Sequence, residues 1–91
     1  MNTISKEEYI QLAEEFVQWI YEHHRVASFP KSELFIKMSE QFKDTTDKDI
    51  IQAKMELCKA MMSVKPEGTT KKILENKMKK LRELLEGDMN G

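Results

Sequence analysis

The segment IIQAKMELCKAMMSV, residues 50–64, carries most of the information about the fold. At about 100° per residue, its apolar side chains cover more than half of a helical circumference. The polar side chains form only a narrow strip, made of Gln52, Glu56, Lys59 and Ser63. A helix that is apolar on most sides is normally buried among its neighbours. We therefore expect a central helix over about 47–64, with Lys54 at the edge of the apolar arc and its amine reaching water.

The N-terminal part predicts a helix that begins at Ser5. Ser5 and Glu8 have the spacing of a capping box, and Ile4 and Tyr9 have that of a hydrophobic staple. One arc of this helix is apolar and contains Tyr9, Leu12, Ala13, Phe16, Val17, Trp19 and Ile20. So wide an arc needs two neighbouring helices, or one neighbour from outside the chain.

Residues 25–30 are expected to connect to a second helix that starts at Pro30, is capped near Ser28 or Phe29, and runs to about Phe42. Its predicted apolar stripe comprises Leu34, Phe35, Met38 and Phe42. Ile36 is expected to point away from this stripe. A turn follows, and Thr46 with Asp49 signals the start of the central helix.

The sequence KPEG, residues 65–68, is expected to end the central helix. A last helix then starts with Thr69 or Thr70 as its cap and has Gly87 as its C′ residue. Its apolar seam repeats at 4-3-4 spacing and comprises Leu74, Met78, Leu81 and Leu85, flanked by Ile73 and Leu84. Less than two heptads cannot specify a coiled coil alone, but such a seam can pack on a core or pair in a dimer.

These patterns together predict an all-α fold, a compact bundle of about four short helices with the third helix central. The 91 residues, 40% hydrophobic and 34% charged, fit a single helical domain over residues 1–91. No apolar run approaches the roughly 20 residues that span a bilayer, and the N-terminus has no signal-peptide pattern. The lone Cys58 excludes an internal disulfide and favours a reducing compartment, so we expect a cytoplasmic protein.

The residues that enzymes use are not arranged for catalysis. His23 and His24 are neighbours, which point about 100° apart on a helix, and with one cysteine no metal-ligand spacing exists. His23 is expected to be a partly buried structural residue. Cys58 lies in an apolar arc, where a thiol is not activated. The acidic side chains of the first helix favour a solvated face, and the glycines form no phosphate loop. We expect no enzyme, no metal and no cofactor.

Charge is distributed unevenly along the chain. Residues 1–58 carry a net charge of −4, residues 59–82 a net +6, and the last nine residues −3. The basic block either faces the acidic half within the fold or marks a surface for an acidic partner. Nucleic acid is one such partner, bound by a helix-turn-helix or winged-helix regulator through the basic last helix. The candidate residues are Lys71, Lys72, Lys79 and Arg82.

The central helix is a poor reader of DNA bases, because its charges cancel and it has neither arginine nor asparagine. A membrane surface is also disfavoured, since the last helix has no Trp or Phe on its apolar face. The leading hypothesis is therefore a small regulatory or adaptor protein that binds a protein partner, or itself as a homodimer, through an apolar helical surface. Methionine-rich and aromatic surfaces adapt to such partners. The residues predicted for this contact are Phe16, Trp19, Ile20, Met78, Leu81 and Leu85, and the alternative for each of them is an ordinary core position.

Overall fold

The structure, a computed structural model, describes residues 4–26 and 32–87, which form four helices and no strand. The helices are α1 (Lys6–His23), α2 (Ser32–Glu40), α3 (Lys48–Ser63) and α4 (Gly68–Glu86). The all-α bundle expected from the sequence is confirmed.

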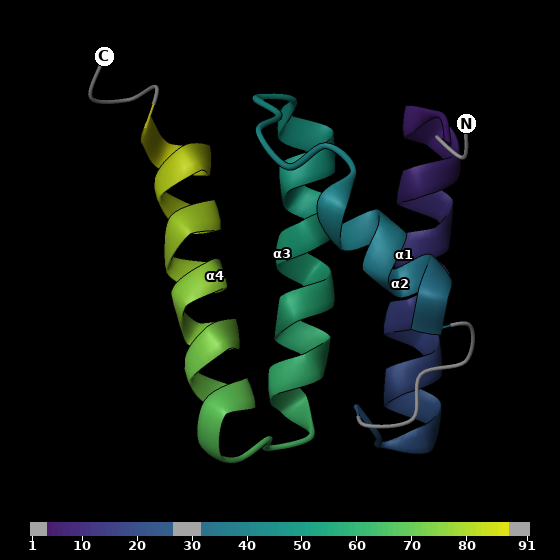
Figure 1. The fold of residues 1–91 in the computed structure, drawn as a ribbon, viewed down its shortest axis with the longest axis vertical. Helices are drawn as coiled ribbons and strands as arrows, with labels where there is room; N and C mark the ends of the chain where they lie inside the picture. The colour runs from purple at the N-terminus through teal and green to yellow at the C-terminus, as the bar shows by residue number, and fades with distance from the viewer. Residues whose placement is uncertain (1–3, 27–31, 88–91) are drawn as a thin grey trace.

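Helices α1, α3 and α4 lie side by side with α3 in the middle (Figure 1). α1 and α3 point in the same direction and α4 runs back along α3, while α2 crosses in front of α1. The body is flat, with principal extents of 39 × 32 × 20 Å, so its thickness is that of about two packed helices. The third helix is central, as predicted, and α4 packs mainly against α3.

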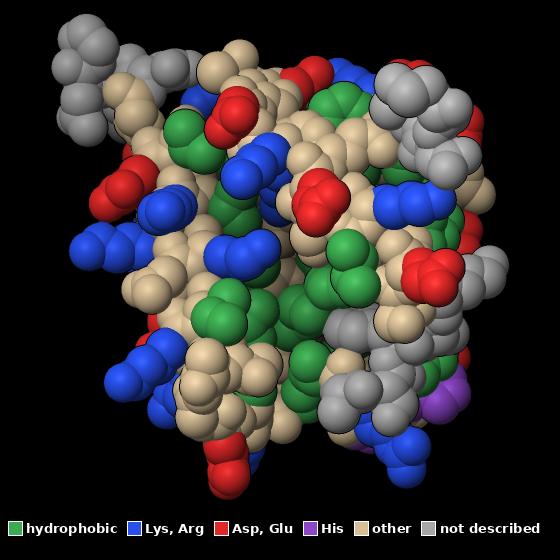
Figure 2. All heavy atoms as spheres, viewed as in Figure 1, with side chains coloured by type: hydrophobic (Ala, Val, Ile, Leu, Met, Phe, Trp, Pro, Cys, Tyr) green, Lys and Arg blue, Asp and Glu red, His purple; other side chains and the backbone are tan. Residues whose placement is uncertain are grey.

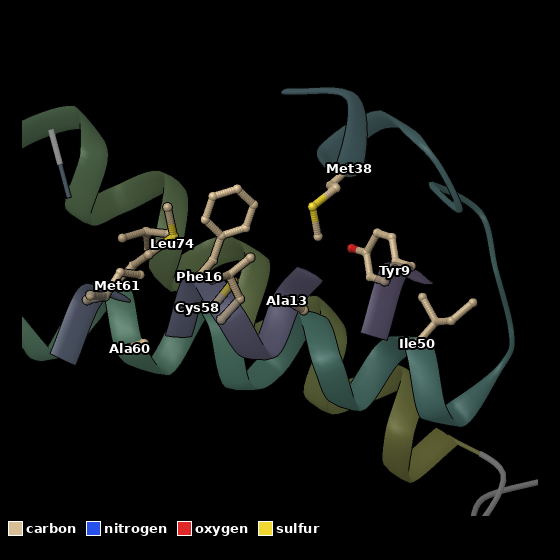
Figure 3. Close-up of a cluster of buried hydrophobic side chains, with 11 residues drawn as sticks. Tyr9, Ala13, Phe16, Met38, Ile50, Cys58, Ala60, Met61 and Leu74 are labelled. Atoms are coloured by element: carbon tan, nitrogen blue, oxygen red, sulfur yellow. The ribbon is translucent and has the colours of Figure 1, made fainter. Parts of the chain in front are cut away.

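The core lies along the inner faces of these helices. Its buried side chains are Tyr9, Ala13, Phe16, Ile20, Met38, Ile50, Ile51, Met55, Leu57, Cys58, Ala60, Met61 and Leu74. Phe16, Cys58, Met61 and Leu74 gather at one end of the cluster, and Tyr9, Met38 and Ile50 at the other (Figure 3). More than half of the buried residues come from α3, because that helix is covered on most sides. Its polar strip is exposed, as predicted.

Helix α2 and the turn that follows it are held against α1 by two edge-on aromatic pairs. The ring centroids of Phe35 and Phe16 are 5.7 Å apart, and those of Phe42 and Tyr9 are 5.3 Å apart. The amide of Gln41 adds two hydrogen bonds to the backbone of Ile4, accepting from its N–H at 3.2 Å and donating to its C=O at 2.6 Å. The short second helix is therefore fixed at both of its ends.

The start of α1 agrees with the predicted cap. Ser5 is the N-cap, and its hydroxyl accepts the Glu8 N–H at 3.1 Å. The carboxylate of Glu8 accepts a bond from the Ser5 hydroxyl at 3.4 Å. Ser5 and Glu8 thus contact one another in both directions. In a capping box the Glu8 carboxylate would accept the backbone N–H of Ser5, whereas here it accepts the Ser5 hydroxyl.

The start of α3 differs from the prediction by one residue. The N-cap is Asp47, not Thr46, and its carboxylate accepts the Asp49 N–H at 2.9 Å. Thr45 fixes this conformation, since its hydroxyl accepts the Asp47 N–H at 3.0 Å. Lys6 of α1 forms salt bridges with Asp47 at 2.9 Å and with Asp49 at 3.1 Å. The hydrogen bond with Lys6 lowers the pKa of Asp47, so the cap stays ionised.

Replacement of Asp47 by alanine is expected to lower the melting temperature by about 4–8 °C, because it removes the cap of the central helix. Thermal unfolding followed by circular dichroism measures this change. The matched control is Thr46→Ala, at the exposed neighbour that caps nothing, which should leave the melting temperature within about 2 °C. Equal shifts for both variants would contradict the assignment of the cap. Since the pKa of Asp47 is lowered in the folded state, the difference between wild type and Asp47→Ala should shrink as the pH falls through that pKa.

The other helix boundaries also need correction. α2 ends at Glu40 rather than near Phe42, because Phe42 has a left-handed backbone with φ of 58°. Its predicted start at Ser28, Phe29 and Pro30 lies outside the described residues.

Neither Thr69 nor Thr70 caps α4. That helix begins at Gly68, whose φ of 64° suits glycine and reverses the chain after α3. Gly87 is not a left-handed C′ residue, since its φ and ψ are −59° and −33°. Instead, Lys48 of α3 satisfies the end of α4 by donating to the carbonyls of Leu84 and Leu85 at 2.9 and 3.0 Å.

Candidate binding interface

The structure separates the six residues predicted to contact a partner into two groups. Phe16 and Ile20 are core residues, 5% and 0% exposed, so a partner cannot reach them in the folded chain. Trp19 is half-buried, and its ring stacks on that of His23 with centroids 4.7 Å apart. Of the α1 residues in this set, only Trp19 reaches the surface.

The α4 residues are more accessible. Leu74 is buried, whereas Met78, Leu81 and Leu85 are half-buried, and of these three Met78 and Leu81 pack against the core. Because α4 packs mainly against α3, its apolar seam is covered on one side. This seam is a candidate contact surface.

Two further side chains extend this surface, and they were named in the sequence only as flanks of the seam. Ile73 and Leu84 are 49% and 47% exposed. Ile73 and Leu84 lie three helical turns apart on the same side of α4. Around the helix axis, that side is roughly 100° away from the side that faces α3. Ile36 of α2 is also exposed and points away from the core, as predicted. Hydrophobic side chains gather on the face that α2 and α4 share, with both basic and acidic side chains around them (Figure 2).

A shallow groove of about 600 Å³ lies between α1 and α3. Its apolar lining consists of Ile10, Ala13, Val17 and Ala53. Its polar lining consists of Glu14, Gln18, Asp49, Gln52 and Glu56. The small side chains of Ala13 and Ala53 leave this space open, and three carboxylates line it. This groove cannot be predicted from helical periodicity, because it depends on which faces of α1 and α3 meet.

The lysines and arginine of α4 are exposed, including the four candidate nucleic-acid contacts Lys71, Lys72, Lys79 and Arg82. Among the described residues, the salt bridges join Lys6 to Asp47 and Asp49, and Lys59 to Glu56. None of them involves a cation of α4. Of these bridges, only Lys59–Glu56 joins the basic block of residues 59–82 to the acidic half, and it lies within α3. The alternative in which the two halves face one another inside the fold stays a prediction.

The central helix is not placed like a DNA-reading helix. α1 and α4 flank α3 on its two sides, and its exposed strip is the narrow one of Gln52, Glu56, Lys59 and Ser63. A recognition helix must instead present a protruding face to the major groove. The cations predicted to contact nucleic acid lie instead on the edge helix α4.

The residues considered for chemistry are dispersed. His23 is exposed rather than partly buried, because it ends α1, with its Nδ1 3.0 Å from the Trp19 carbonyl oxygen. Cys58 is buried, and burial raises the pKa of its thiol, so the reactive thiolate is disfavoured. Residues 4–26 and 32–87 hold no group of three His, Cys, Asp or Glu side chains that could bind a metal. Within the same residues, no helix is both long and apolar enough to cross a bilayer.

Comparison of the chain with protein-family models, with curated proteins and with solved structures finds no match. The functional proposal therefore depends on the surfaces described above.

Proposed function

We propose that this protein is a small, non-enzymatic regulator or adaptor that binds a helical segment of a partner protein through the apolar side of α4. The contact residues are Ile73, Leu84 and the half-buried seam of Met78, Leu81 and Leu85. The observation that carries the proposal is the one-sided packing of α4, which leaves large apolar side chains in water at the edge of the fold. Such side chains gain free energy when a partner covers them.

The double variant Ile73→Ser with Leu84→Ser tests this proposal. Both side chains are about half exposed, so the double variant is expected to fold, and circular dichroism checks that it does. In quantitative cross-linking in the native host, the partner should be captured at least about tenfold less by the variant than by the wild type. The matched control is Asn76→Ser with Glu83→Ser, two exposed positions elsewhere on α4. Equal capture by wild type, test variant and control would contradict the proposal.

Nucleic-acid binding is the second candidate, and the exposure of four basic residues without a salt bridge favours it. Lys71, Lys72, Lys79 and Arg82 fall within about 100° of one side of α4. If all four neutralise phosphates, log Kd for random duplex DNA should change with log salt concentration with a slope of about 3–4. Absence of binding at low salt would remove this candidate.

A further inference from the structure

Three of the exposed large apolar side chains lie on the two edge helices of the layer. They are Tyr21 of α1 and Ile73 and Leu84 of α4. α1 and α4 are separated by α3, so these side chains cannot cover one another within one chain (Figure 1). Each edge helix therefore carries its own uncovered stripe.

The α1 stripe is Ile10, Glu14, Val17 and Tyr21, with helical spacing i, i+4, i+7 and i+11. Its first three members line the groove between α1 and α3. Two other carboxylates of the groove already have cations, since Asp49 pairs with Lys6 at 3.1 Å and Glu56 with Lys59 at 3.7 Å. Among the described residues, no salt bridge involves Glu14. The α1 stripe is thus apolar at both ends with a negative charge between them.

The α4 stripe is Ile73, Lys77, Lys80 and Leu84, and it has the same spacing. No salt bridge of the described residues involves either lysine. Burial, with a smaller contribution from the charge of Lys77, lowers the pKa of Lys54, so Lys77 and Lys54 repel one another within the chain. The α4 stripe is apolar at both ends with positive charge between them.

The two stripes match in length and are opposite in charge. In each, the terminal apolar residues are 11 positions apart, about 16 Å along the helix. An α4 stripe placed along an α1 stripe brings both apolar ends together and sets lysines beside Glu14. Contact between two α4 stripes would instead set lysines against lysines, and contact between two α1 stripes would oppose two Glu14 carboxylates.

We infer that the groove and stripe of α1 receive the α4 stripe of a second copy of this chain. The inference depends on the proposed function, because it names the partner of the α4 surface. Since the two surfaces differ and lie on different helices, the contact is heterologous, and a bound copy still offers a free stripe at each end of the assembly. Such contacts continue head to tail unless the rotation between copies closes a ring. A contact of one helix with one groove is small, so the dissociation constant is expected on the order of 10–100 μM.

Static light scattering of the full chain tests this assembly. At 50 mM salt, the mean mass of the wild type should rise continuously from the monomer value as the concentration increases from about 5 to 500 μM. Glu14→Lys alone should stay monomeric, because both of its stripes are then positive. Lys77→Glu with Lys80→Glu should also stay monomeric, because both stripes are then negative.

A 1:1 mixture of these two variants provides the decisive measurement. Each variant then offers the stripe that the other lacks, so the mean mass should rise again to at least half of the wild-type increase. The matched control is Lys37→Glu with Lys43→Glu, an equal change of charge at exposed positions outside both stripes, which should associate like the wild type.

A wild type that stays monomeric at 500 μM would overturn the inference, as would a mixture that stays monomeric. The inference would also be overturned if the control variant, Lys37→Glu with Lys43→Glu, lost association as fully as Lys77→Glu with Lys80→Glu. The change in net charge alone would then explain the result. None of these outcomes removes the proposed function. That function fails only if capture of a partner does not depend on Ile73 and Leu84.

Discussion

Replacement of Phe16 by alanine is expected to lower the free energy of unfolding by about 3–5 kcal/mol, which is a large part of the stability of a domain of this size. The Phe16 side chain is 5% exposed, lies beside Cys58, Met61 and Leu74, and packs edge-on against Phe35 at 5.7 Å. Its removal leaves a cavity in the core that joins α1 to α3, and it also frees one of the two aromatic contacts that hold α2. Urea unfolding followed by circular dichroism measures the change.

The matched control for this prediction is Ile36→Ala on α2. Ile36 is 57% exposed, so its truncation should change the free energy of unfolding by less than about 0.5 kcal/mol. A Phe16→Ala variant within about 1 kcal/mol of the wild type would show that this side chain does not belong to the core. Phe16 would then again be a candidate for contact with a protein partner, as predicted from the sequence.

Alkaline solution is expected to destabilise the protein through Tyr9. Burial, with a smaller contribution from the charge of Cys58, raises the pKa of this tyrosine from 10.0 to about 12. The unfolded chain therefore loses the phenolic proton at lower pH than the folded chain does. The contribution of the Tyr9 proton to the free energy of unfolding is therefore complete below pH 10 and is lost as the pH rises from about 10 to 12. The loss in the free energy of unfolding amounts to about 2–3 kcal/mol.

The measurement compares wild type with Tyr9→Phe, which keeps the ring and has no proton to lose. Urea unfolding at pH 8 and at pH 11.5, in the presence of a reductant, gives the loss of stability for each protein. Lysines and Cys58 titrate in both proteins, so only the difference between the two losses reports on Tyr9. If the two proteins lose the same free energy, Tyr9 is not buried as the structure places it.

Several features of the fold could be predicted because they depend on local spacing. The apolar arc of residues 50–64 predicted the central helix, and the exposure of Gln52 and Glu56 on its polar strip agrees with it. Ser5 and Glu8 predicted the start of α1 for the same reason, since a cap involves residues three apart. The cap of α3 was assigned one residue too early, because Thr46 and Asp47 are both good caps and Thr45 selects Asp47.

The interface was predicted less well. Phe16 and Trp19 belong to one apolar arc, and nothing in that arc shows which member α2 covers. The structure places Phe35 on Phe16 and leaves Trp19 at the border, so the two residues have different roles. Ile73 and Leu84 became candidates only because α4 packs at the edge of the layer.

Helical periodicity and capping act within a few residues, so the amino-acid pattern is enough to predict four helices, a central third helix and the apolar side of each helix. The apolar side chains that remain in water can be identified only in the folded chain, since exposure depends on the neighbours that each helix has. With α3 between them, α1 and α4 each keep one side uncovered. Glu14 on α1 and Lys77 and Lys80 on α4 are exposed to solvent and carry opposite charges.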